Sequence, residues 1–315
     1  MKILCYSAFL LLSVPVLAQS AIDSSLLMET IRTLSDNKFE GRKTGTRGNR
    51  MAQFYIRDAF KKVGVVPYNG TYEYPFYFEA GGKRIMGTNL YGYIQGKSDQ
   101  AIVITAHYDH LGVGKPPAPA TDSIYNGADD NASGVSAMLA IAQYFHQHPP
   151  QHTLIFAALD AEEMGLEGAK AFLQHPPVPV AQMKLNINMD MVSRNDNQEL
   201  YVCGTHQFPE LKEVITAVAP QSKIKLVTGH DKKEDGANDW TSQSDHFEFF
   251  KLHIPFLYFG VEDHPDYHKV SDEFSRIHPA FFYQATTTIR MVISAADKAM
   301  MAGKFRSLKV MEGNK

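Results

Sequence analysis

After residue 130 the sequence alternates between short apolar segments and longer segments with helical spacing, and this pattern most constrains the fold. The expected strands are 72–78, 88–94, 101–107, 153–159, 184–189, 223–228 and 254–260. The expected helices are 23–36, 48–63, 133–147, 166–175, 208–219 and about 278–302. Continuous apolar strands between amphipathic helices are typical of parallel sheets covered on both sides. We therefore expect an α/β fold with a mostly parallel central sheet flanked by helices on both faces.

The N-terminus has the features of a secretory signal peptide. A positive charge on Lys2 precedes the apolar run Ile3–Val16, and small residues lead up to Ala18. The run is shorter than the roughly 20 residues that a membrane span needs. We expect cleavage after Ala18, export as a secreted or periplasmic protein, and a mature chain 19–315 that forms one domain without a membrane span. Its one cysteine, Cys203, excludes an intramolecular disulfide.

Composition excludes some partners. The formal net charge is -3, so the chain lacks the basic field that nucleic acids or anionic membranes attract. No low-complexity linker or internal repeat divides the mature chain. The polar segment 229–243 is either a loop near the site or an excursion without fixed structure. The oligomeric state is left open by these features.

Ionisable side chains stand where the expected strands end. The carboxyl ends of parallel strands meet at one sheet edge, which is where open α/β sheets bind ligands. The residues at these ends are His107 and Asp109, then Asp130, then Glu162 and Glu163, then Asp190, and finally the segment 263–272. Single carboxylates in turns commonly cap helices, as Asp130 could for the helix at 133. Five such turns at one edge favour a site instead.

Imidazole and carboxylate ligands together suit zinc. Asp109 is placed to orient the ring of His107. Glu162 and Glu163 are neighbours whose side chains diverge in an extended turn, so one can bind metal while the other accepts a proton. With Asp130 and Asp190 they form four negative charges, which two divalent ions would balance.

The chain resembles the M28 family of zinc peptidases, the co-catalytic metallo-aminopeptidases, whose fold is the zinc aminopeptidase or phosphorylase/hydrolase type. The resemblance covers nearly the whole mature chain through eight segments in the family's order: "FEGRKTGTRG", "GTNLYGYIQG", "AHYDHLG", "NGADDNASG", "DAEEMGLEGA", "NMDMVSR", "SDHFEFF" and "PDYHKVSD".

The resemblance implies a role for each matching position. His107 and Asp190 would hold one zinc ion, Glu163 and His268 a second, and Asp130 would bridge the two. Glu162 would be the general base, Asp109 would orient His107, and Tyr267 would steady the tetrahedral intermediate. His110 and His264 are expected to support the site, and Ser244, Asp245 and His246 to shape its pocket. The Asp130–Asn131 peptide bond is expected to be cis.

The implied function is hydrolysis of the N-terminal peptide bond of substrates with a free amino terminus. Three alternatives remain. A glutaminyl cyclase would use one zinc ion on the same fold, a dipeptidase or carboxypeptidase would use the same site on other termini, and a binding protein would have lost activity. The complete set of ligands and base disfavours the last.

Overall fold

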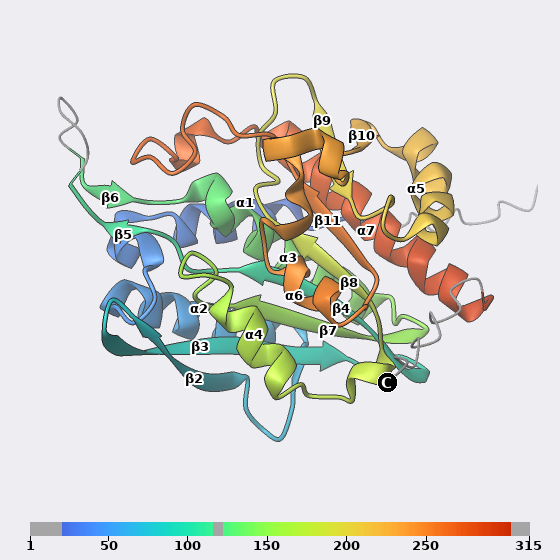
Figure 1. The fold of residues 1–315 in the computed structure, drawn as a ribbon, viewed down its shortest axis with the longest axis horizontal. Coiled ribbons are helices and arrows are strands. Elements are labelled where there is room, and N and C mark those ends of the chain that lie inside the picture. Colours follow the sequence, from blue (N-terminus) through green and yellow to red (C-terminus); the bar gives the residue numbers. More distant parts are fainter. Residues whose placement is uncertain (1–20, 116–121, 304–315) are drawn as a thin grey trace, which may run out of the picture.

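The structure, a computed structural model, describes residues 21–115 and 122–303. The expected signal peptide, residues 1–18, lies outside the described residues. A nine-stranded mixed sheet crosses the molecule in the order β1-β3-β7-β4-β8-β11-β9-β10, with β2 paired to β3 (Figure 1). A separate two-stranded ribbon, β5 with β6, lies beside it.

The strands are β1 (Val66–Pro67), β2 (Glu73–Ala80), β3 (Lys83–Ile94), β4 (Ser98–His107), β5 (Gly112–Val113), β6 (Ile124–Tyr125), β7 (His152–Leu159), β8 (Met183–Met189), β9 (Glu199–Cys203), β10 (Lys225–Thr228) and β11 (Phe256–Gly260). The α-helices are α1 (Ser24–Leu34), α2 (Arg47–Val63), α3 (Gly134–Gln147), α4 (Glu167–Gln174), α5 (Lys212–Val218), α6 (His246–Lys251) and α7 (Pro279–Met301).

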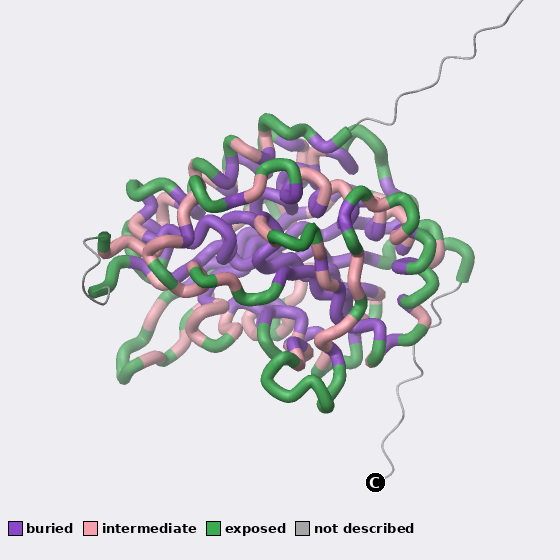
Figure 2. The backbone as a smooth tube through the Cα atoms, turned by 90° about the horizontal axis from the view of Figure 1, so that it is seen from above, coloured by how far each residue is buried: buried purple, intermediate pink, exposed green. Residues whose placement is uncertain are grey.

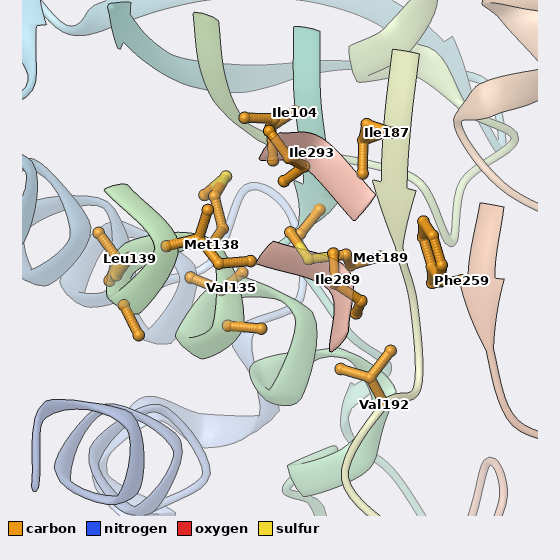
Figure 3. Close-up of a cluster of buried hydrophobic side chains, with 14 of the residues drawn as sticks. Ile104, Val135, Met138, Leu139, Ile187, Met189, Val192, Phe259, Ile289 and Ile293 are labelled. Atoms are coloured by element: carbon orange, nitrogen blue, oxygen red, sulfur yellow. The ribbon is translucent and has the colours of Figure 1, made fainter. Parts of the chain in front are cut away.

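Both faces of the central strands are buried, which explains their continuous apolar sequences. Along β4, Ile102 and Ile104 face a core shared with α1, α2, α3, α5 and α7, while Ala101 and Val103 face a second core shared with α4 and α6. Figure 2 shows the buried chain at the centre and exposed chain at the periphery. Figure 3 shows the larger core, with strand residues Ile104, Ile187, Met189 and Phe259 beside Val135, Met138, Leu139, Ile289 and Ile293 of α3 and α7.

The expected α/β class is confirmed, and the centre of the sheet is parallel. Strands β7, β4, β8 and β11 run in one direction. The margins are antiparallel, because β3 opposes β7 and β9 opposes β11. The sequence pattern did not predict β9 or the short helix α6. Strand β9 has only five residues and follows a polar turn, so no long apolar run marks it.

The segment 229–243, whose structure the sequence left open, folds against the sheet. It forms two short turns, Lys233–Asn238 and Trp240–Ser242. The Trp240 ring is buried, stacks on the His230 ring at 3.8 Å between centroids and meets the Tyr258 ring edge-on.

Cys203 is buried as a free thiol. No helix within the described residues is both long and apolar enough to cross a membrane.

Candidate metal centre

The predicted site residues meet at the carboxyl edge of the parallel strands. His107 is the last residue of β4, and Asp190 directly follows β8. Asp130 lies in the turn Ala128–Ser133 before α3, and Glu162 and Glu163 lie in the turn after β7. His268 lies in the segment after β11, where its backbone has a positive φ of 53°.

His107 and Asp190 form one half of the centre. The His107 Nε2 atom is 3.2 Å from Oδ1 of Asp190 and 3.5 Å from Oδ1 of Asp130. Asp190 is held from behind, because the Ser244 hydroxyl donates to its Oδ2 at 2.8 Å. Ser244 in turn accepts a hydrogen bond from the Asn188 side chain at 2.9 Å.

Glu163 and His268 form the other half. The His268 Nε2 atom is 3.0 Å from Oδ2 of Asp130 and 3.4 Å from Oε2 of Glu163. The two oxygens of Asp130 therefore face opposite halves, as a bridging ligand requires. The fully buried His110 adds a third nitrogen, with its Nδ1 2.8 Å from Oε1 of Glu163 and 3.6 Å from Oδ2 of Asp130.

These separations fit zinc. Ligand bonds of about 2.0–2.1 Å in a tetrahedron put neighbouring ligand atoms about 3.3 Å apart. The four distances from His107 and His268 to the carboxylates span 3.0 to 3.5 Å. The His110–Glu163 contact of 2.8 Å is shorter and has the length of a charge-assisted hydrogen bond. His110 therefore orients the Glu163 carboxylate, while the opposite oxygen of Glu163 faces His268.

The electrostatics show a site that demands positive charge. Burial disfavours a charged His107, but Asp190, Glu162 and Asp109 outweigh burial and raise its pKa well above the usual value. Burial likewise opposes a charged His268, and hydrogen bonds with Asp130 and Glu163 still raise its pKa to about 10. The raised pKa of both rings shows that the surrounding carboxylates favour positive charge at this position.

Glu162 differs from its neighbour Glu163. Burial raises the pKa of Glu162 well above its usual value, although His107 opposes this shift. Burial also acts on Glu163, but hydrogen bonds from His110 and His268 reverse the effect and hold its pKa far below the usual value. A carboxylate oxygen of Glu162 lies within 4.8 Å of ligand atoms of His107 and Asp190. The two side chains thus serve different halves of the site.

The turn that carries Asp130 is fixed by Asp272. The Asp272 carboxylate accepts the backbone N–H groups of Asp129 and Asp130 at 3.0 to 3.1 Å. The Asp130–Asn131 peptide bond is cis, which confirms the expectation. The Asn131 side chain donates to the carbonyl of Met189 and so ties this turn to the end of β8.

A buried arginine joins the strand ends from behind. Arg42 donates to the carbonyls of Tyr108, Asn126 and Gly127 and to that of Leu34, at 2.6 to 2.9 Å. It follows Gly41, whose φ of +62° and close approach to the carbonyl of Tyr125 leave no room for a side chain. The segment that the sequence predicted as a glycine-rich turn therefore clamps two ligand-bearing loops together.

The remaining predicted residues also lie at the site. The ring of His107 donates from Nδ1 to the backbone carbonyl of Asp109 at 3.2 Å, and the Asp109 carboxylate is farther away at 3.7 Å. That carboxylate accepts the Glu162 N–H at 3.1 Å and so also positions the proposed base. Tyr267 stacks on His268 at 4.0 Å, and burial together with Asp130 and Asp190 raises the pKa of its phenol.

The two expected supporting histidines and the remaining pocket residues have defined partners or surroundings. His264 contacts Asp129 at 3.1 Å, and Asp129 also accepts from Ser193. His246 contacts the Trp240 carbonyl at 2.9 Å, which ties α6 to the 229–243 segment. The Asp245 carboxylate is buried and has no hydrogen-bond partner among the described residues, and burial raises its pKa to about 8.

Sequence reasoning missed Arg42 and Asp272 and did not foresee how directly His110 contacts Glu163. Arg42 and Asp272 both lie inside segments that carried the family resemblance, "FEGRKTGTRG" and "PDYHKVSD". The available signal was a charged residue inside such a segment that had no expected role as a ligand or base. His110 stands three residues after His107, beyond the strand, so the alternation of a strand could not place it.

A mixed sheet with imidazole and carboxylate ligands at the ends of its parallel strands defines a metallohydrolase-like protein of the zinc peptidase class. Residues 89–293 match the family model described as Peptidase family M28. The chain belongs to this family.

Individual relatives match over shorter stretches. The "Alkaline phosphatase isozyme conversion protein" of Escherichia coli K12 is 28% identical over 193 residues, covering 56% of this chain and 54% of that protein. "Aminopeptidase YwaD" of Bacillus subtilis 168 is 35% identical over 109 residues, covering 34% of this chain and 22% of that protein. The chain thus spans about half or less of these curated relatives.

The fold also matches solved structures. The Porphyromonas gingivalis glutaminyl cyclase superposes with a TM-score of 0.71 at 17% identity, covering 87% of this chain and 99% of that chain. At this identity the match concerns the fold alone.

Proposed function

We propose that this protein is a zinc-dependent aminopeptidase that removes N-terminal residues from peptides with a free amino terminus. The observation that carries the proposal is the paired ligand set, in which the two oxygens of Asp130 face His107 and Asp190 on one side and Glu163 and His268 on the other. The similarity to a B. subtilis aminopeptidase supports it.

Two residues of the chain, Glu162 and Tyr267, have distinct roles in the proposed hydrolysis. Zinc ions in such a paired site polarise a peptide carbonyl and lower the pKa of a water molecule. Glu162 accepts the proton of the attacking water and delivers it to the leaving amine. Its raised pKa suits a group that must take up a proton and release it again. The Tyr267 phenol, whose neutral form is favoured by its raised pKa, can donate a hydrogen bond to the developing oxyanion.

The same charges favour a free amino terminus. A substrate ammonium group entering the site meets the carboxylates of Glu162, Glu163 and Asp190, which attract it. A substrate with a blocked amine lacks this attraction and is disfavoured.

The test compares aminoacyl-anilides with the same compounds N-acetylated, using protein whose zinc content is measured. We expect two zinc ions per chain and cleavage of the free-amine substrates only. Equal cleavage of blocked peptides at their carboxyl ends would replace the aminopeptidase with a carboxypeptidase. One zinc ion per chain, with ring closure of an N-terminal glutamine, would identify a glutaminyl cyclase.

Export is the second part of the proposal, and it rests on the apolar run that ends near Ala18. When the full chain is expressed in a secreting bacterium, we expect the exported protein to begin at Gln19. An unprocessed N-terminus in the cell interior would contradict export.

A further inference from the structure

A cavity lies at the opposite edge of the sheet from the metal centre. It has a volume of about 310 Å³ and is bounded by α5, α7 and the turn 148–151, which leads from α3 into β7. Strand β7 begins there at His152 and ends beside Glu162. Eight strand residues at about 3.3 Å each put the two sites roughly 25 Å apart. The cavity is therefore separate from the catalytic edge.

One wall of this cavity carries a buried arginine that has no anionic partner among the described residues. Arg290 is only 8% exposed, and its Nε atom is buried without a hydrogen-bond partner. Among the described residues, its one specific contact is with the Tyr144 ring, 4.7 Å from the guanidinium carbon. A long side chain on a surface helix can ordinarily extend its charge into water. Arg290 instead lines the cavity with most of its surface buried and its Nε atom shielded from solvent.

The nearest carboxylate on the same helix is already engaged. Asp297 also lines the cavity, two turns after Arg290. Its carboxylate accepts the backbone N–H groups of Gln151 and His152 at 2.8 Å and contacts Nδ1 of His152 at 2.7 Å. It forms no ion pair with Arg290, so no carboxylate in the described part of the chain binds the guanidinium.

The rest of the lining suits a small anion. Helical spacing places Arg290, Ser294 and Lys298 along one ridge of α7, which gives two cations with a hydroxyl between them. Ala217, Val218 and Ala295 provide an apolar wall. A planar guanidinium binds carboxylate and phosphate groups through two parallel hydrogen bonds. We propose that this cavity binds a small oxyanion, a carboxylate or a phosphate group, through Arg290.

The test measures binding of two probes, inorganic phosphate and isovalerate, by calorimetry in a buffer free of other oxyanions. The wild-type protein is compared with Arg290→Met, with the metal centre intact in both. An oxyanion that binds at the metal centre binds both proteins, so the difference reports on Arg290. We expect a binding event in the wild type that is lost or weakened at least about tenfold in Arg290→Met. Stronger binding of isovalerate than phosphate would identify a carboxylate with an apolar body as the ligand, and the reverse would identify a phosphate.

Controls separate a ligand-binding arginine from a structural one. Arg84→Met removes an exposed arginine that also lies over a tyrosine ring, that of Tyr77 at 4.2 Å, and should leave binding unchanged. Without ligand, Arg290→Met should melt no lower than the wild type, because it removes a buried charge that lacks an anion. Arg290→Lys keeps the charge but loses the two-pronged geometry and should bind weakly.

The proposal is overturned if neither probe binds the wild type beyond what Arg290→Met binds. It is also overturned if Arg290→Met melts well below the wild type and the oxyanions bind both proteins alike. In that case Arg290 only balances the carboxyl ends of α3 and α5.

Discussion

At the scale of single residues, the direction in which a side chain points decides which partners it meets and therefore which role it can take. Glu162 and Glu163 are adjacent and chemically identical, yet their pKa values shift in opposite directions. Glu163 is held by His110 and His268, and this hydrogen bonding favours its ionised form. Glu162 has no such pair of donors, so burial dominates. The fold therefore suits Glu163 to bind a cation and Glu162 to accept a proton.

This difference predicts opposite results from the same substitution. Glu162→Gln should keep both zinc ions but lower kcat by a factor on the order of 10²–10⁴, because the amide cannot accept a proton. Glu163→Gln should lose zinc and activity together. Metal analysis and steady-state kinetics on both variants provide the measurement. Loss of zinc in Glu162→Gln with retention in Glu163→Gln would reverse the two assignments.

His110 supplies a second prediction at this scale. Its N–H orients the Glu163 carboxylate at 2.8 Å, so His110→Ala should weaken zinc binding roughly 10- to 100-fold, the usual effect of losing such a partner. His110→Asn, which can still donate a hydrogen bond, should recover part of the affinity. Competition with a chelator measures this change. His148→Ala, far from the centre, is the matched control, and an equal loss there would refute the positioning role.

At the scale of elements, the site depends on how loops are joined behind the strand ends. His107 ends β4, the loop after β4 carries His110, and the turn after β6 carries Asp130. Arg42, from the segment before α2, donates to carbonyls in both loops. Asp272, from the segment after β11, holds the Asp130 turn through its backbone. Elements distant in the chain thus fix the ligands in place.

Because Arg42 joins these two loops, we expect its removal to destabilise the protein strongly. Arg42→Met should lower the free energy of unfolding by about 3–5 kcal/mol, because it leaves several buried carbonyls without donors. Urea unfolding of the metal-free protein measures the change without a contribution from zinc binding. Arg57→Met removes a half-buried arginine of α2 whose nearest partner is the adjacent, exposed Asp58, and it should change stability by less than about 1 kcal/mol. Similar losses in both variants would contradict the clamp.

At the scale of the whole molecule, buried titratable groups link stability to pH. His246 is fully buried, and burial lowers its pKa to about 4. The unfolded chain has a histidine pKa of about 6.5. Between these values the unfolded state binds more protons than the folded state, so stability is complete above pH 6.5 and falls as the pH is lowered toward 4.

One variant can isolate the contribution of His246 to the pH dependence of stability. Between pH 6.5 and 5, His246 should cost the wild type about 2 kcal/mol of stability. His246→Gln keeps a donor for the Trp240 carbonyl but does not titrate, so its pH dependence should be smaller by that amount. Urea midpoints of both metal-free proteins at the two pH values provide the comparison. Parallel pH profiles would show that His246 does not contribute.

The sequence by itself determined the α/β class, most of the central strands and helices, and which ionisable residues stand at the strand ends, whereas the roles expected of those residues came from the family resemblance. Apolar periodicity is local, so it marks strands such as 101–107 and helices such as 133–147 directly. The topology of parallel strands then brings their carboxyl ends to one edge, which is why the sequence already groups His107, Asp130, Glu163 and Asp190 at that edge.

Only the tertiary structure decided how these groups are held. The contacts of Arg42 with Gly127 and of Asp272 with Asp130 join residues 85 and 142 positions apart. No periodicity encodes such contacts, because they depend on how loops approach each other in space. The same reason hid strand β9, which is short and gains its place from pairing with β11. The cavity at Arg290 could not be predicted for the same reason. Whether an arginine on a helix has an anionic partner depends on the residues that other elements bring next to it.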